Sequence, residues 1–157
     1  MKLQTIAVLI WLTLSGCRYL HNSPTTPEPW YPSVNANSDP VFAVFESRIP
    51  CADCEKIKVA LVLYRHSETK APTTYKLARI YVAKRPEDRI VVDGTWTITR
   101  GTNLDPNAIV YQLDANAPQE FQTFWVAGQD ILFILDHKLR PKVGTAGYSY
   151  ALNRMRY

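Results

Sequence analysis

Residues 90–100 read Ile90-Val91-Val92-Asp93-Gly94-Thr95-Trp96-Thr97-Ile98-Thr99-Arg100. In the second half of this stretch, Trp96 and Ile98 fall on one face of an extended chain, and Thr95, Thr97 and Thr99 fall on the other. A period of two residues is typical of a β-strand with one buried face. The stretch therefore predicts a strand that places Trp96 in a hydrophobic core.

Seven further segments are similarly rich in β-branched and aromatic residues: 41–49, 57–66, 74–84, 108–113, 121–126, 131–136 and 148–154. Turn-forming groups separate several of them, at 85–88, 105–107, 127–130 and 141–147. Within 90–100, Asp93-Gly94 predicts an interruption, with Gly94 allowing a tight turn or a bulge. About eight strands with no helical period predict an all-β antiparallel meander. We expect an up-and-down β-barrel, since closure removes exposed edges, with an open sandwich as the alternative.

Length and composition bound the class of protein. The chain has 157 residues, 46% of them hydrophobic and 20% charged, which fits one folded domain and excludes wholesale disorder. The net charge is +4, and the basic residues are scattered along the chain. A nucleic-acid-binding surface would need a basic stripe or cluster, so no nucleic-acid partner is expected.

The first residues have the pattern of an export signal. Lys2 precedes a short apolar run over 6–14, about half of the roughly 20 residues that a transmembrane helix needs. Leu14-Ser15-Gly16-Cys17 resembles the bacterial lipobox, which implies cleavage after residue 16 and acylation of Cys17. Arg18 follows in place of the aspartate that often retains lipoproteins at the inner membrane, so we expect the outer membrane, with the protein facing the periplasm.

Residues 17–40 are expected to form a tether between the lipid anchor and a domain over 41–157. Five of the eleven prolines fall between 18 and 40, a composition that favours extended polyproline geometry. Trp30 and Tyr31 are exceptions to this polar stretch, and we expect them to dock on the domain, the alternative being the lipid interface.

Cys51 and Cys54 are separated by two residues in Pro50-Cys51-Ala52-Asp53-Cys54-Glu55. In an oxidising periplasm they can form a disulfide, which we expect as the resting state. They can also act as a redox pair or bind a soft metal. A thioredoxin-like role would need a βαβ context, and zinc would usually need four ligands, whereas Cu(I) needs as few as two.

Three other residues are candidate partners for a metal at Cys51 and Cys54. His66 and His137 sit at predicted strand ends and Met155 is near the C-terminus, although we expect each on the surface. His21 lies in the tether. The spacing of the acidic residues selects no acid–base pair, and no nucleophile motif or phosphate-binding loop is present, so we predict that the protein is not an enzyme.

Taken together, these motifs resemble the N-terminal domain of the NlpE copper-resistance lipoproteins. The resemblance spans most of 41–157 and is most specific at Pro50-Cys51-Ala52-Asp53-Cys54. It continues through 61–64, 74–77, 94–101, 110–113, 135–136 and 148–154. It implies a lipocalin-like barrel, a role in copper tolerance, and signalling of envelope stress or surface contact to the Cpx sensor kinase. Cys51 and Cys54 would then be the copper-handling pair.

The chain also departs from the NlpE pattern. Lys56 stands where the family often has glycine, and Arg79 stands where it commonly has an acidic residue. Longer members carry a second, cysteine-containing domain, and the present sequence ends at Tyr157. Two alternative functions remain: a lipocalin-like carrier of a small apolar ligand or lipid, and a lipoprotein that docks to another envelope protein.

Overall fold

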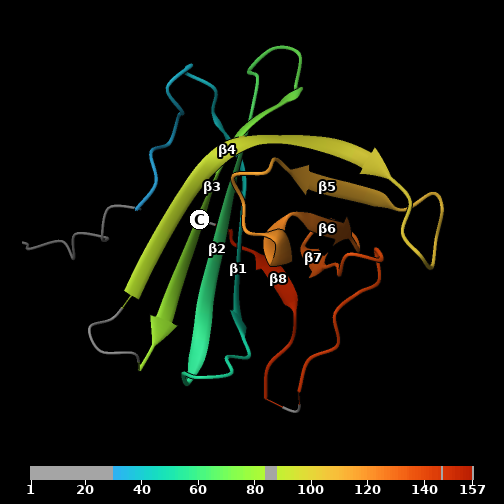
Figure 1. Cartoon of the computed structure of the whole chain (residues 1–157). Coiled ribbons are helices and arrows are strands. Elements are labelled where there is room, and N and C mark those ends of the chain that lie inside the picture. The colour runs from blue at the N-terminus through green and yellow to red at the C-terminus, as the bar shows by residue number, and fades with distance from the viewer. Residues whose placement is uncertain (1–29, 84–87, 146, 157) are drawn as a thin grey trace, which may run out of the picture.

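The computed structural model describes residues 30–83, 88–145 and 147–156. Eight antiparallel strands close into a barrel in chain order, which confirms the predicted up-and-down topology and excludes the open sandwich (Figure 1). The strands are β1 (Val41–Ile49), β2 (Lys56–Arg65), β3 (Pro72–Val82), β4 (Asp88–Arg100), β5 (Ile109–Leu113), β6 (Thr123–Val126), β7 (Ile131–Ile134) and β8 (Ala151–Arg154). One 3₁₀ turn, η1 (Gln119–Phe121), precedes β6.

The barrel is uneven, because its first four strands are long and its last four are short. Strands β1 to β4 have 9, 10, 11 and 13 residues, whereas β5 to β8 have five or four. β4 pairs with β5 only from Trp96 to Arg100, and β1 pairs with β8 only at Phe45 and Glu46. The long strands therefore extend past the closed part of the barrel (Figure 1).

The interior is filled by the protein's own side chains. Those that are buried almost completely include Tyr75, Trp96, Phe121, Phe124, Leu61, Leu63, Leu77, Leu132, Ile134 and Leu152. Trp96 is 2% exposed, as predicted, and its indole Nε1 donates to the Tyr64 carbonyl at 2.9 Å. Ile98, two residues further along β4, is 44% exposed. The alternating pattern of 90–100 places Ile98 on the same face as Trp96, but this face is buried only at Trp96.

The predicted interruption at Asp93-Gly94 is wrong, because β4 runs unbroken from Asp88 to Arg100. Gly94 pairs with Tyr75 in β3. A Cβ atom at Gly94 would lie 2.4 Å from Oδ1 of Asp114, so the glycine permits a close approach within the sheet. The strand predicted over 148–154 is shorter in the structure, where β8 begins at Ala151. Tyr148 instead forms an isolated bridge with Thr145.

Residues 30–40 lie against the barrel instead of extending away from it as a tether. Trp30 and Tyr31 pack on a cluster formed by Val44, Val62 and Tyr64, which confirms the expected docking of the aromatic pair. The Tyr64 hydroxyl donates to the Pro32 carbonyl at 2.9 Å. The predicted signal sequence, Cys17 and His21 lie outside the described residues.

Within the described residues, no helical segment has the length and apolar character needed to cross a membrane.

Candidate redox and metal site in the loop between β1 and β2

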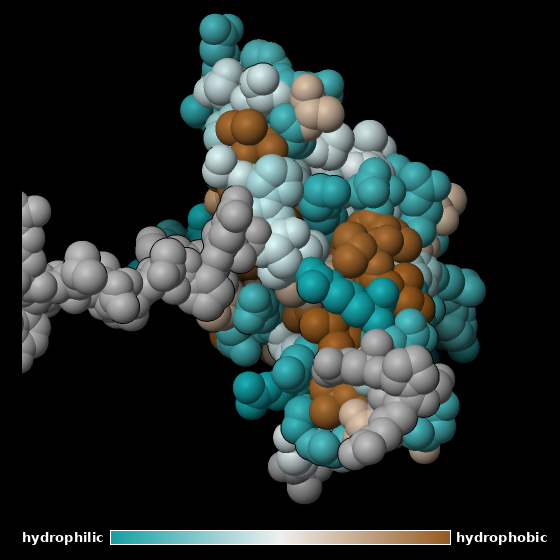
Figure 2. Space-filling model, turned by 90° about the vertical axis from the view of Figure 1, so that its left-hand side faces the viewer, coloured by the Kyte–Doolittle hydropathy of each residue, from teal (hydrophilic) through white to brown (hydrophobic). Residues whose placement is uncertain are grey.

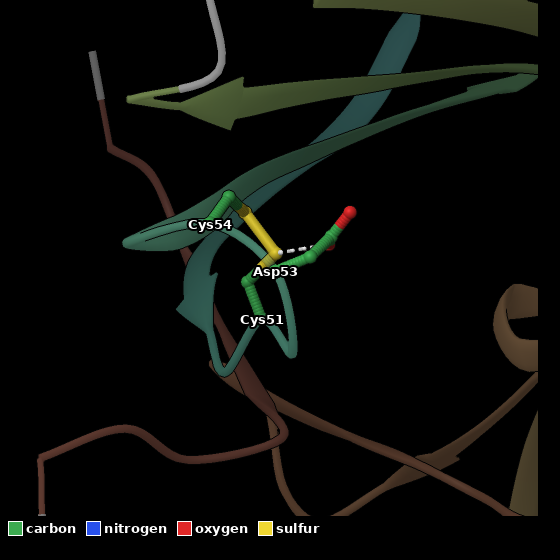
Figure 3. Close-up of side chains that lie close together, drawn as sticks. All are labelled: Cys51, Asp53 and Cys54. Carbon is green, nitrogen blue, oxygen red and sulfur yellow. Dashed lines mark hydrogen bonds between the residues drawn. A yellow bond between two sulfur atoms is a disulfide. The ribbon is translucent and has the colours of Figure 1, made fainter.

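Residues 50–55 connect β1 to β2 at the end where the long strands project. Ile49 pairs with Ile57 at the base of this loop, and the Glu55 amide donates to the Val82 carbonyl of β3 at 3.2 Å. The ladder thus fixes both ends of the loop and leaves its tip outside the sheet. Cys51 and Cys54 lie in it with their Cα atoms 5.3 Å apart and their sulfur atoms 2.00 Å apart, at disulfide bonding distance (Figure 3).

Asp53 is the third member of this site. Its Oδ1 lies 3.4 Å from Sγ of Cys51, and one potential ligand atom from each of the three residues falls within 4.8 Å of the others (Figure 3). Among the described residues, this is the one group of three or more His, Cys, Asp or Glu side chains so arranged. The sequence prediction named the two cysteines but missed Asp53. The signal for it was a carboxylate placed between the two thiols of the motif.

The site is accessible and has cations beside it. Cys51 and Cys54 are half-buried, and Asp53 is exposed. Glu55 forms an ion pair with Lys56, and a hydrogen bond from the Lys56 ammonium, with its charge, lowers the pKa of the Glu55 carboxyl. Sγ of Cys54 lies 3.5 Å from the Lys56 carbonyl oxygen. Solvent and small solutes can therefore reach the sulfur atoms.

The chemistry of this pair depends on its redox state. Reduction of the disulfide takes two electrons and two protons and gives two thiols. Deprotonated thiols are soft ligands that suit Cu(I), and a carboxylate can sit beside them. The disulfide lacks thiolates, so the residues fit a soft metal only in the reduced form.

The other candidate ligands do not join this group. His66 follows β2 at its far end, about 30 Å from the loop along a ten-residue strand, and Nδ1 of His66 accepts from the amides of Glu68 and Thr69. His137 is exposed in the turn after β7. Met155 is 36% exposed, and its amide donates to Val44 near the middle of β1. Their expected surface positions are confirmed.

Arg79 is buried inside the barrel at 8% exposure. Its Nη1 lies 3.2 Å from the Tyr81 hydroxyl and 3.4 Å from Oε1 of Glu120 in η1. Its Nε has no hydrogen-bond partner among the described residues. A cation therefore occupies the interior at this position, with Glu120 as its counterion.

A further pocket of about 390 Å³ lies at the mouth of the barrel, away from the cysteine loop. It is lined by Phe42, Phe45, Ile109, Tyr111, Val126, Gly128, Gln129 and Arg154. The Arg154 guanidinium donates to the Phe42 carbonyl at 3.1 Å. Burial raises the pKa of the Tyr111 hydroxyl, and the positive charges of Arg65 and Arg154 oppose that rise. The pocket thus combines apolar walls with a cationic group.

Comparison with known proteins gives one family match. The sequence model of the NlpE N-terminal domain matches residues 45–144. A search of curated proteins finds no match. Among solved structures, a presumed lipoprotein from Shewanella oneidensis is similar, with 23% identity and a TM-score of 0.47, covering 73% of this chain and 89% of that one. The family match includes both cysteines and β2 to β7, and extends over more than half of the chain. The protein therefore belongs to the family of the NlpE N-terminal domain, which supports its assignment as a bacterial envelope lipoprotein of the NlpE type.

Proposed function

We propose that this protein is a lipoprotein anchored in the outer membrane through acylated Cys17, and that it supports copper tolerance and reports envelope stress or surface contact to the Cpx sensor kinase. The observation that carries the proposal is the accessible Cys51–Cys54 pair beside Asp53, on a barrel of the NlpE family. The protein acts by binding and signalling and not by catalysis.

The redox state of the pair determines when copper is bound. With the disulfide closed, no thiolate is available, and the Cys51–Asp53–Cys54 group offers only the Asp53 carboxylate as a ligand. After reduction by a dithiol, Cys51 and Cys54 supply two soft ligands on a loop whose ends are fixed by β1, β2 and β3. Copper binding is therefore expected only of the reduced protein.

A Cu(I) titration against a competing chelator tests the metal-binding part. The reduced protein should bind one equivalent, whereas the oxidised protein and the Cys51→Ser/Cys54→Ser variant should bind at least 100-fold more weakly. Glu55→Gln is the matched control, because Glu55 lies in the same loop but outside the Cys51–Asp53–Cys54 group. Equal affinity of the double variant and the parent protein would exclude this site.

Copper tolerance and signalling are tested in cells that lack the chromosomal gene. Complementation with the parent gene should restore growth in copper and the response of a Cpx-dependent reporter, and the double cysteine variant should fail in the copper assay. Restoration of both by the double variant would leave the pair without the proposed role.

A second candidate function, the carriage of a small amphiphile, is favoured by the pocket at the barrel mouth. Its volume of about 390 Å³ is within the range of ligand sites, although the interior beneath it is filled by aromatic side chains. Val126→Trp would fill the pocket and should abolish binding of a fluorescent fatty acid. Val143→Trp, at a site that is 90% exposed, is the control and should leave binding unchanged.

A further inference from the structure

The outer face of the long strands carries a groove of about 830 Å³. Its lining includes the small side chains Ala60 of β2 and Ala78 of β3, together with Trp30 and the segment 147–149. Asn153 of β8 and Met155 also line it. The groove is thus formed where the docked residues 30–31 and the segment before β8 border the projecting part of the sheet.

Among the described residues, four cations line this groove: Arg48, Lys56, Lys58 and Arg89. Glu46 is the one acidic residue that the described part of the chain contributes to the lining, and Glu55 nearby is paired with Lys56. Arg48 and Lys58 are direct partners in the β1–β2 register, and like charges in that position repel each other. An anion between them would remove that repulsion, so the groove has the electrostatics of an anion-binding surface.

The groove face also bears apolar and aromatic groups. Cζ of the Arg89 guanidinium lies over the Trp30 ring, 5.4 Å from the ring centroid. Val91, on the same face of β4 as Arg89, is 43% exposed. The side of the molecule presented in Figure 2 is mixed in this way, with apolar clusters set between hydrophilic side chains. Indole rings and basic side chains beside apolar groups suit the boundary between lipid headgroups and acyl chains.

The position of Trp30 indicates what covers this face. Trp30 is 13 residues beyond Cys17, so a chain this short spans at most about 45 Å. If Cys17 is acylated, as the proposed function requires, the bilayer lies within that reach of the groove. A lipid anchor combined with a basic surface is a common two-signal mode of membrane attachment.

We propose that this groove and the face around it rest on an anionic bilayer, with headgroup phosphates among Arg48, Lys58 and Arg89. The inference rests on the proposed anchoring through Cys17. It adds an orientation: the outer face of β1–β4 turns toward the membrane, and the loop with Cys51 and Cys54 is held near the bilayer surface, because Lys56 adjoins both the loop and the groove.

Lysine footprinting of the full lipoprotein in nanodiscs tests this orientation. In discs that contain phosphatidylglycerol, acetylation of Lys56 and Lys58 should slow at least threefold relative to phosphatidylcholine discs, and 0.5 M salt should abolish the difference. Lys138, in the turn after β7, is the internal control. Arg48→Glu should abolish the protection of Lys58, whereas Arg100→Glu, at the exposed end of β4, should preserve it. If Lys56 and Lys58 are acetylated at the same rate in the two kinds of disc, the proposal is overturned, whether or not both discs slow the reaction.

The intact mass of the same sample separates this inference from the proposed anchoring. If acyl chains are absent from Cys17, the anchoring fails, and sedimentation of the unacylated chain with phosphatidylglycerol vesicles then decides the inference alone. Salt-sensitive sedimentation that Arg48→Glu abolishes would support the basic face. If the unacylated chain does not sediment with the vesicles, the inference is overturned. It is also overturned if Lys58 is protected only when an envelope protein is added and anionic lipid has no effect.

Discussion

Arg79 is a cation in a position where an apolar core residue would be expected. Its side chain reaches the Tyr81 hydroxyl, Glu120 of η1 and the ring of Phe121, whose centroid lies 5.7 Å from its Cζ. Its Nε lacks a partner among the described residues, so part of the cost of removing the guanidinium from water is not offset. Ion pairs of this kind are weak sources of stability, although breaking one from a single side is costly.

This asymmetry gives a prediction at Arg79. Glu120→Ala leaves a buried cation without its counterion, and we expect it to lower the free energy of unfolding by about 1–2 kcal/mol. The cost stays small because Glu120 is itself half-exposed, so water can replace part of its contribution. Arg79→Met removes the charge and keeps an apolar side chain, and it should change stability by less than about 1 kcal/mol. Urea denaturation midpoints compare the two, and a larger loss from Arg79→Met would contradict this account.

Among the elements, β3, β4 and the turn after β5 are joined through Asp114. Its carboxylate accepts from the Thr95 amide at 2.7 Å, the Thr95 hydroxyl at 3.1 Å, the Tyr75 hydroxyl at 3.1 Å and the Asn116 amide at 3.1 Å. Burial alone would raise the pKa of Asp114, but these hydrogen bonds hold it below its ordinary value. Burial and the adjacent carboxylate raise the pKa of the Tyr75 hydroxyl.

Gly94 is predicted to be essential to this junction. In Gly94→Ala the new Cβ would meet the Asp114 carboxylate at 2.4 Å, so the carboxylate must move and lose hydrogen bonds. We expect a loss of about 2 kcal/mol in the free energy of unfolding. In Gly94→Ala/Asp114→Ala the obstruction is gone, so the loss should be smaller than the sum of the two single effects. Additive losses in thermal or urea unfolding would show that Gly94 acts independently of Asp114.

The same elements show how far sequence patterns could predict the fold. β1 spans the residues predicted for it, and the other long strands differ by a few residues, because period-two patterns and turn residues mark strands well. The pattern at Asp93-Gly94 led to a wrong prediction, because a glycine in a strand can mark either a turn or a close approach of another group. Here that group is Asp114, which is distant in sequence. The pairing of Arg79 with Glu120 could not be predicted, since it depends on where η1 meets the interior.

The candidate site was predictable in part for similar reasons. Cys51 and Cys54 carry a local motif, so the sequence identified them. The basic groove has no such motif, because its cations come from three different strands, β1, β2 and β4, and form no recognisable pattern in the sequence. The pairing of the strands, which places Arg48 opposite Lys58, brings these cations onto one face of the sheet.

At the scale of the whole molecule, the reactive loop and the barrel core are separate. The core contains Tyr75, Trp96 and Phe124, whereas Cys51 and Cys54 lie beyond the last β1–β2 pair, Ile49 with Ile57. The pair closes a ring with a sequence separation of 3, so it constrains only a short piece of the unfolded chain. The loop can therefore change redox state while the barrel keeps its fold.

We accordingly predict a small effect of the disulfide on stability. Cys51→Ser/Cys54→Ser should lower the free energy of unfolding by no more than about 2 kcal/mol, because the loop-closure entropy of so short a ring is small. Far-ultraviolet circular dichroism should be unchanged, and reductant should shift the unfolding midpoint of the parent protein but not of the variant. If the variant fails to fold, the Cys51–Cys54 disulfide is needed for the fold itself. A barrel that unfolds on reduction could not present two thiolates to a metal, so that result would also contradict the proposed copper site.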